Sequence, residues 1–249
     1  MYNFFVNKQL KKDAIITIVG EDFNHIKNVL RMKVGEKIYL SANSKTALCV
    51  ISDFTNDSVI VKVLEEDCLG TELPIEIYLF QGLIKADKFE LVLQKAVELG
   101  VKGIYPVEMS RSVVKIEEKK KSQKTERWQA IAEAGAKQSK RNIVPTVFEP
   151  ISYKNAVKLA KEMDLFLVPY ENKNGMKPTL DALKKIKDNV KVAILIGPEG
   201  GFEENEIELA KTSGGEIISL GKRILRAETA SITAISACMM YAEININKD

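Results

Sequence analysis

The chain has few of the residues that build metal centres and disulfide frameworks. Its 249 residues include one histidine and three cysteines. Cys49, Cys68 and Cys238 are odd in number and far apart, which favours free thiols in a reducing cytoplasm over a disulfide framework. With one histidine and no closely spaced cysteines, we expect neither a structural zinc site nor any other bound metal.

Long apolar runs are also missing. No segment approaches the roughly 20 apolar residues needed to cross a bilayer. The N-terminal residues 1–8 lack the charged segment and long apolar core of a secretory signal. The composition, 45% hydrophobic and 29% charged, is that of an ordinary globular protein. We therefore expect a cytoplasmic protein with no membrane partner, built from one large domain or two smaller ones.

Charge is unevenly distributed, although the net charge is only +3. Residues 111–141 hold ten Lys and Arg against four Asp and Glu, a local charge of +6. Residues 1–45 hold eight Lys and Arg against four Asp and Glu, and residues 199–249 hold five Lys and Arg against nine Asp and Glu. Two basic regions beside an acidic C-terminal part are consistent with a polyanionic partner. A solvated loop or helix end is the alternative explanation of the lysine run 119–121.

Residues 1 to about 70 are rich in short, closely spaced strands. Turn residues separate the strands, a pattern typical of a small barrel or sandwich. A helix over residues 22–33 interrupts them, with Phe23, Ile26, Val29 and Leu30 on one face. The predicted strands are residues 2–6, 15–19, 37–41, 47–51 and 59–64.

After residue 72 the pattern changes to strands that alternate with helices, which predicts a mainly parallel α/β sheet. We place the domain boundary there, giving domains 1–71 and 72–249. Trp128 lies on the apolar face of its helix, which favours core packing over base stacking. The predicted strands are residues 75–83, 103–107, 146–148, 165–168, 192–196 and 217–220. The predicted helices include residues 87–99, 124–139 and 228–244.

Two glycine-bearing turns follow two of these strands, at residues 197–201 and around Gly221. Such turns in an α/β pattern mark a small-molecule site. Glu203, Glu204 and Glu206 open the next helix, where they suit the helix dipole but would repel a phosphate. The first loop also lacks the Lys-Ser/Thr pair of a P-loop. The ligand is therefore expected to carry no phosphate, which disfavours ATP and NAD. A sulfonium-bearing adenosyl ligand, S-adenosylmethionine, fits better.

Specific motifs follow one another along nearly the whole chain. They are His25-x-x-x-Val29-Leu30-Arg31, Lys85-x-Asp87-Lys88-x-Glu90, Gln94-Lys95-x-x-Glu98-Leu99-Gly100-Val101, Ser110-Arg111-Ser112, Glu126-Arg127-Trp128, Glu133-Ala134 with Gln138 and Arg141, residues 196–202, and Arg223-Ile224-Leu225-Arg226-x-Glu228-Thr229-Ala230. In their order and spacing these motifs resemble the ribosomal RNA small subunit methyltransferase E family, of the SPOUT superfamily. The small departures at Gly135 and Lys140 threaten no role.

The resemblance implies an N-terminal PUA-like β-barrel that binds RNA and a C-terminal SPOUT methyltransferase domain with a deep trefoil knot. It also implies S-adenosylmethionine as the cofactor, a homodimer, and methylation of N3 of a uridine in 16S rRNA of the small ribosomal subunit. The glycines allow close backbone approach, and Leu195, Leu220 and Leu225 can enclose the adenine. The alternative is that the glycines only form turns and the leucines only form core. The family's cofactor loops map onto Leu195, Ile196, Gly197, Glu199, Gly200, Gly201, Leu220, Gly221, Ile224, Leu225, Arg226, Thr229 and Ala230.

Methylation of uracil N3 requires the loss of the N3 proton, because the protonated imide nitrogen is not nucleophilic. A nearby base or a cation that stabilises the anionic ring lowers this barrier. Arg226 is the candidate cation, and Glu228 or Glu199 is the candidate for orienting the base or accepting the proton. Structural roles remain open, since Glu228 could cap the last helix and Glu199 could brace the loops.

The candidate RNA-binding residues are histidine or basic residues within the family motifs. Arginine pairs with phosphate in a bidentate manner, which favours the arginines for phosphate contact. For the two lysines, a solvated first helical turn capped by Asp87 is the alternative. Two other functions also stay open: ribose 2′-O methylation, and a non-catalytic RNA-binding protein for ribosome assembly. The candidates are His25, Arg31, Lys85, Lys88, Arg111 and Arg141.

Overall fold

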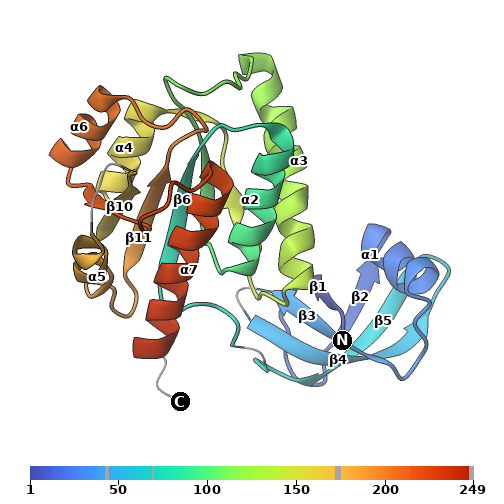
Figure 1. Cartoon of the computed structure of the whole chain (residues 1–249). Coiled ribbons are helices and arrows are strands. Elements are labelled where there is room, and N and C mark those ends of the chain that lie inside the picture. The colour runs from blue at the N-terminus through green and yellow to red at the C-terminus, as the bar shows by residue number, and fades with distance from the viewer. Residues whose placement is uncertain (43–44, 69, 172–174, 247–249) are drawn as a thin grey trace. The chain divides into compact units, whose positions relative to one another are not determined.

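The computed structural model describes residues 1–42, 45–68, 70–171 and 175–246 (Figure 1). The chain divides into two units. The first comprises Met1–Glu72 with Ala136–Val144, and the second comprises Leu73–Gly135 with Pro145–Asp249. The sequence placed the boundary between residues 71 and 72 and did not assign residues 136–144 to the first unit. No helix in the described part of the chain is long and apolar enough to span a bilayer.

The first unit contains a five-stranded sheet in the order β1-β3-β4-β5-β2. Its core forms because apolar residues alternate along the strands, as in β2, where Ile16 and Ile18 are buried while Ile15 and Val19 are exposed. The five predicted strands are all present. Their bounds are β1 Asn3–Phe5, β2 Ile15–Val19, β3 Lys37–Ala42, β4 Lys45–Phe54 and β5 Ser58–Glu65.

The helix predicted over residues 22–33 is shorter than expected. It consists of α1 (Gly20–Asn24) and a π-helical turn (His25–Val29). Arg31 then adopts a left-handed conformation with φ of 53°, and the Met32 N–H donates to the carbonyl of Ile26 at 3.0 Å. This closure resembles a Schellman C-cap, with an arginine in the left-handed position that usually holds glycine.

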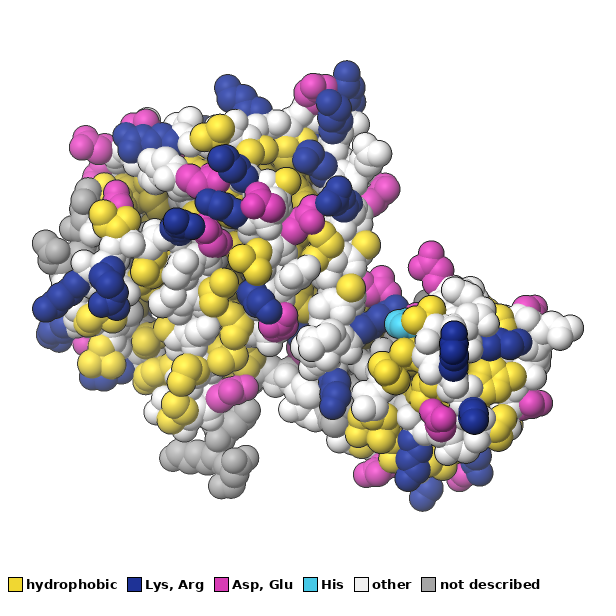
Figure 2. All heavy atoms as spheres, turned by 45° about the vertical axis from the view of Figure 1, so that its right-hand side comes forward, with side chains coloured by type: hydrophobic (Ala, Val, Ile, Leu, Met, Phe, Trp, Pro, Cys, Tyr) yellow, Lys and Arg dark blue, Asp and Glu magenta, His cyan; other side chains and the backbone are white. Residues whose placement is uncertain are grey.

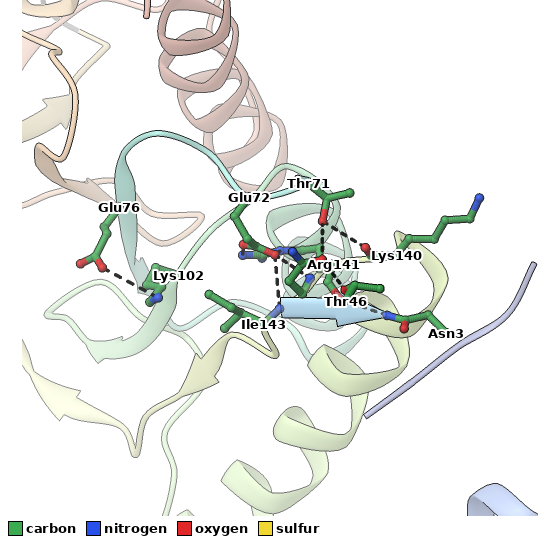
Figure 3. Close-up of polar contacts among 10 residues, drawn as sticks. Asn3, Thr46, Thr71, Glu72, Glu76, Lys102, Lys140, Arg141 and Ile143 are labelled. Carbon is green, nitrogen blue, oxygen red and sulfur yellow. Dashed lines mark hydrogen bonds and ion pairs between the residues drawn. The ribbon is translucent and has the colours of Figure 1, made fainter. Parts of the chain in front are cut away.

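A buried polar network links the segment after α3 to the rest of the first unit (Figure 3). The Glu72 carboxylate accepts hydrogen bonds from the Arg141 guanidinium and from the backbone N–H groups of Asn142 at 2.9 Å and Ile143 at 3.3 Å. The Asn3 side-chain amide donates to the Arg141 carbonyl at 3.1 Å. Strand β1, the linker residue Glu72 and the segment from Arg141 to Ile143 are thus joined in one network.

The prediction that Arg141 contacts RNA is wrong. Its side chain is 3% exposed and forms an ion pair with Glu72, so its donors do not reach a phosphate outside the protein. The arginine was chosen because it lies in a basic, motif-bearing stretch. Its partner lies 69 residues away in sequence and could not be read from that stretch.

The second unit contains a seven-stranded sheet of parallel pairs, which confirms the expected parallel α/β architecture. The order is β12-β10-β11-β6-β7-β8, and β9 also pairs with β7. The strands are β6 Glu76–Gly82, β7 Gly103–Glu108, β8 Thr146–Val147, β9 Ile151–Ser152, β10 Leu165–Pro169, β11 Lys191–Ile196 and β12 Glu216–Ile218. The helices are α2 Ala86–Glu98, α3 Glu118–Gln138, α4 Tyr153–Lys161, α5 Lys177–Leu183, α6 Glu204–Thr212 and α7 Ala227–Asn245.

Helices cover both faces of this sheet (Figure 1). Helix α7 packs on β6 and β11 and contacts α2, whereas α4 contacts β7, β10, β11 and α6. Trp128 is 5% exposed and its ring centroid lies 4.5 Å from that of Phe89, so the predicted core role of Trp128 is confirmed. Because the strands are parallel, the loops after β10, β11 and β12 emerge at the same edge of the sheet, where ligands bind in open α/β folds.

Candidate active site

A pocket of about 330 Å³ lies at this edge of the second unit. Three loops, one after each of β10, β11 and β12, form it together with the start of α7 and one residue of α2. Its size is within the range of small-molecule sites. The lining residues are Lys88, Pro169, Tyr170, Glu171, residues 196–202, residues 219–221 and residues 223–227, with Ala230.

The glycine-bearing loop after β11 is held close to neighbouring backbone. A Cβ atom at Gly200 would lie 2.8 Å from the Arg111 Cβ and 3.1 Å from its carbonyl oxygen. At Gly82, at the end of β6, an added Cβ would lie 2.7 Å from the Pro198 nitrogen. Gly201 adopts φ of 72°, which favours glycine. The close contacts at Gly82 and Gly200 and the positive φ of Gly201 therefore require glycine at these positions. The alternative that the sequence allowed, glycines that only form a turn, does not account for them.

Replacing Gly200 with Ala is expected to push the loop away from Arg111 and to weaken ligand binding in the pocket at least about tenfold, a cost of about 1.4 kcal/mol. Titration calorimetry with S-adenosylmethionine would measure this change. Gly70→Ala is the matched control, since a Cβ there meets nothing within 4 Å among the described residues and Gly70 lies outside the pocket. Wild-type affinity in Gly200→Ala would contradict the packing argument.

Arg111 braces the same loop. Its Nε and one terminal nitrogen donate to the two carboxylate oxygens of Glu203 at 2.8 and 3.2 Å, and its other terminal nitrogen donates to the Gly200 carbonyl at 3.3 Å. Glu203 is the N-cap residue of α6. The side chain of Arg111 remains 47% exposed, so its predicted contact with RNA stays a prediction, beside the structural role that the geometry gives it.

Beneath this loop, Glu206 joins the turn after β7 to the start of α6. Its carboxylate accepts hydrogen bonds from the backbone N–H groups of Ser110 at 3.0 Å and Glu203 at 2.9 Å. The Tyr153 hydroxyl donates to the Glu206 carbonyl. Burial, and to a smaller extent the Glu206 carboxylate, raises the pKa of Tyr153 far above its ordinary value, so this phenol stays protonated and keeps its donor at neutral pH. The Ser110-Arg111 motif is thus part of the support of the pocket.

The two candidate carboxylates have different surroundings. Glu199 is exposed, and one of its oxygens accepts a hydrogen bond at 3.1 Å from the backbone N–H of Lys85, the N-cap residue of α2. Glu228, in the first turn of α7, has a side chain that is only 12% exposed. Its Oε1 lies 3.7 Å from the Nζ of Lys88, and its Oε2 is buried without a hydrogen-bond partner in the described structure.

A buried carboxylate oxygen without a hydrogen bond costs free energy unless a bound group donates a hydrogen bond to it. Glu199 lines the pocket and has the partner that a bracing residue needs. Glu228 does not line the pocket, but it adjoins the lining residue Lys88 and keeps one acceptor without a partner in the described structure. The unpaired acceptor favours Glu228 over Glu199 for contact with a proton donor. Arg226 is the N-cap residue of α7, lines the pocket and is exposed, and within the described residues its guanidinium forms no ion pair.

Most of the predicted cofactor residues line the pocket, but two do not. Leu195 is 0% exposed and packs in the core with residues of α4 and α6. Its placement against the adenine is wrong, because successive strand residues point to opposite faces and Ile196 is the one that faces the pocket. Thr229 is exposed and does not line it.

Several pocket residues were not predicted as cofactor-binding. Pro169, Tyr170 and Glu171 follow β10, and Lys88 was assigned only to RNA. The residues after β10 could have been found, since β10 was predicted and its loop must emerge beside the other two. Phe202 and Arg223, also in the lining, stood in the quoted motifs without a role.

The predicted RNA-binding residues are dispersed. His25 and Arg31 are exposed in the first unit, where the His25 ring lies edge-on to Phe4. Lys85 is exposed in the second unit. None of these three predictions is tested by the structure, whereas Lys88 lies in the pocket.

Acidic partners accompany most of the basic stretch 111–141. Figure 2 shows basic and acidic side chains intermixed over the larger unit. Exposed ion pairs of this kind contribute little to stability and can be exchanged for RNA phosphates. The stretch therefore carries a weaker positive field than its local charge suggested. The pairs are Arg111–Glu203, Lys119–Glu117, Lys120–Glu117, Lys121–Glu108, Arg127–Glu90, Lys137–Asp22 and the buried Arg141–Glu72.

Comparisons with known proteins agree with this fold and site. Residues 71–239 match the family described as RNA methyltransferase domain, and residues 18–64 match the RNA methyltransferase PUA domain. The Ribosomal RNA small subunit methyltransferase E of Bacillus subtilis (strain 168) is 36% identical over 98% of both chains. That of Mesomycoplasma hyopneumoniae (strain 232) is 34% identical over 96% of this chain and 99% of its own.

Among solved structures, the Ribosomal RNA small subunit methyltransferase E of Neisseria gonorrhoeae, bound to S-adenosyl methionine, superimposes with a TM-score of 0.84. It is 30% identical and covers 96% of this chain and 97% of its own. The region that matches the RNA methyltransferase domain, residues 71–239, includes every residue that lines the pocket. The chain belongs to the ribosomal RNA small subunit methyltransferase E family, with a PUA domain followed by a SPOUT-type α/β methyltransferase domain.

Proposed function

We propose that this protein transfers a methyl group from S-adenosylmethionine to N3 of a uridine in 16S ribosomal RNA. The observation that carries the proposal is the pocket, whose glycine loops suit a nucleoside and whose lining residue Lys88 lies 3.7 Å from the Glu228 carboxylate. The other oxygen of that carboxylate is buried without a partner in the described structure. Family membership supports the small-subunit RNA as the substrate.

The residues of the pocket fit the proposed cofactor. Gly197 packs against the Phe202 ring and Gly200 against Arg111. Without side chains of their own, these two residues offer peptide groups that can read an adenine edge, and Leu220 and Leu225 offer apolar contact. Glu203 and Glu206, which open α6, are both occupied by protein donors and disfavour a phosphate there. The bound cofactor supplies an electrophilic methyl group carried on a sulfonium.

The residues of the chain supply what uracil N3 requires. Glu228 accepts the imide proton on its free Oε2, and the electron pair of the N–H bond stays on the ring as an anion spread over N3, O2 and O4. Arg226 stabilises the negative charge on one of these oxygens through charge-assisted hydrogen bonds. Glu199 holds the glycine loop against the start of α2 and takes no part in proton transfer.

Replacing Arg226 with Ala is expected to slow single-turnover methyl transfer about 10²- to 10³-fold, because one donor to the developing anion is lost. Rapid-quench measurement at saturating RNA and cofactor would report the chemical step. Lys222→Ala serves as the control, since Lys222 lies in the same loop, is exposed and does not line the pocket. An unchanged rate in Arg226→Ala would make the assigned role wrong.

Two experiments test the proposed function itself. Calorimetry should detect binding of S-adenosylmethionine, and its failure would favour a non-catalytic RNA-binding protein. Nucleoside mass spectrometry of ribosomal RNA from a deletion strain should show the loss of 3-methyluridine. An unchanged 3-methyluridine peak with the loss of a 2′-O-methylated nucleoside would favour ribose methylation.

The proposal extends to partners and location. The PUA domain is expected to bind the RNA of the small subunit, in the cytoplasm. We expect a homodimer, which is supported by apolar residues exposed on α7, where Met240 is 54% and Ile244 is 70% exposed. The trefoil knot implied by the family resemblance stays an expectation.

A further inference from the structure

Lys88 lines the pocket and forms a charge pair with Glu228, which is not among the lining residues. Lys88 belongs to α2 and Glu228 to α7, two helices that pack against each other. The Lys88 Nζ and the Glu228 Oε1 are 3.7 Å apart, and the two side chains are 29% and 12% exposed. At this distance the groups attract each other but do not form a short hydrogen bond. Within the described structure, the three N–H donors of the ammonium have no hydrogen-bond acceptor.

The charges of the pair change when Glu228 works as a base. In the resting site, the carboxylate compensates the ammonium. Once the carboxylate takes up a proton, the ammonium lies uncompensated in a partly buried position, while a negative charge has appeared on the substrate. A cation next to a developing anion in a partly buried site stabilises it more than it would in water. The total charge of the uracil, the Glu228 carboxyl group and the Lys88 ammonium stays constant through the step.

We infer that Lys88 is a catalytic residue of the same site, whose ammonium contacts a carbonyl oxygen of the target uracil as N3 loses its proton. This inference rests on the proposed function. In the step, the N3–H bond breaks, an O–H bond forms at the Glu228 Oε2, and the electron pair remains on the imide. The ammonium exchanges its attraction to Glu228 for a hydrogen bond to O2 or O4.

The same arrangement selects uracil over cytosine as the target nucleobase. Uracil presents two carbonyl acceptors on either side of an N–H donor. The pocket lining offers Lys88 and Arg226 as donors, and the unpaired Oε2 of Glu228, the residue next to Lys88, is the acceptor. Cytosine has an acceptor at N3 and an amino group at C4, so it would place an acceptor against the carboxylate and a donor against a cation. Unpaired or mismatched polar groups of this kind discriminate strongly between ligands.

The test compares Lys88→Met, which removes the charge at similar length, with Lys88→Arg, which keeps it. Lys88→Met is expected to slow single-turnover methylation about 10²- to 10³-fold, and Lys88→Arg should retain a rate within about tenfold of wild type. Lys95→Met is the matched control, because Lys95 is on the same helix, pairs with Glu98 and lies outside the pocket. Calorimetry with S-adenosylmethionine should give the same affinity for all four proteins.

A second readout does not depend on turnover. RNA carrying 5-fluorouridine at the target position is bound to the protein with S-adenosylhomocysteine, and the ¹⁹F shift reports ionisation of N3. At one fixed, mildly alkaline pH, wild type and Lys88→Arg should hold a larger ionised fraction than free RNA, and Lys88→Met should not. The more acidic 5-fluorouracil should also reduce the rate defect of Lys88→Met relative to uracil.

Each outcome distinguishes the two levels of the argument. If wild type neither binds the cofactor nor methylates uridine, the proposed function fails. If wild type is active and Lys88→Met matches it, only the role of Lys88 is overturned. Equal defects in Lys88→Met and Lys88→Arg, with an unchanged ¹⁹F shift, would reduce Lys88 to a structural link between α2 and α7. A loss of RNA affinity with a normal rate at saturation would make Lys88 a phosphate contact and also overturn the inference.

Discussion

Glu228→Gln is expected to slow methyl transfer about 10²- to 10⁴-fold, the range found when a positioned general base is removed. The amide has nearly the same shape as the carboxylate and can still accept a hydrogen bond, but it cannot take up the imide proton. Binding of S-adenosylmethionine should stay within about threefold, because the loss concerns an interaction needed only in the chemical step. Single-turnover kinetics and calorimetry on the same preparations would measure both quantities.

The companion variants separate chemistry from packing. Glu243→Gln removes an exposed carboxylate near the other end of α7 and should leave rate and affinity unchanged. Combining Glu228→Gln with Lys88→Met should cost little more than Glu228→Gln alone, since groups that act as a unit are not additive. Multiplicative losses in the double variant, or a Glu228→Gln protein as fast as wild type, would contradict the proton-transfer role.

The sequence was most informative where one pattern determines one structure. The run Val192–Ile196 could only be a buried strand, and the glycines after it required a turn at the edge of the sheet. Order and spacing of the motifs then identified the family, which periodicity could not have done. The sequence therefore predicts that the glycine loop and the start of α7 belong to one pocket.

The sequence did not reveal to which face a strand residue points, or which residues far apart in the sequence come into contact. Because β11 is apolar on both faces, its sequence does not show that Ile196 faces the pocket while Leu195 faces the core. Lys88 was identified as a basic residue of α2, but only the packing of α2 on α7 brings it to Glu228. The sequence also left open whether Glu199 acts as a base or braces the loops, and the hydrogen bond that it accepts from the Lys85 N–H supports the bracing role.

The lysine run 119–121 illustrates the same limit for charge. The sequence predicts a helix that begins near residue 124, after the run. In the structure, α3 begins at Glu118 and includes the run. In the helix, Lys121 lies between Glu108 and Glu118, with its side chain 14% exposed. Counting charges along the chain overestimated the free positive charge, because it could not include an acid from another element such as Glu108.

Glu72→Gln is expected to destabilise the first unit by about 3–5 kcal/mol. The substitution keeps the shape of the side chain but removes the carboxylate that pairs with the Arg141 guanidinium, whose side chain is 3% exposed, and breaking a buried ion pair by removing one partner is costly. For a domain of this size the loss corresponds to a fall in melting temperature of about 10 °C or more. Trp128 belongs to the second unit, so its fluorescence is not the right probe. Hydrogen exchange measured by mass spectrometry should show faster exchange in β3, β4 and β5 and unchanged exchange in β6 and β11.

The source of that loss can be separated from general disruption of the network. Adding Arg141→Met to Glu72→Gln removes the buried cation as well, so the double variant should be less destabilised than the sum of the two single variants. Asp67→Asn breaks the exposed Lys45–Asp67 pair in the same unit and should change stability by no more than about 0.5 kcal/mol. Additive losses in the double variant would mean that the two side chains act through separate contacts. In that case the buried charge pair would not explain why the segment from Arg141 to Ile143 belongs to the first unit rather than to the helix that precedes it.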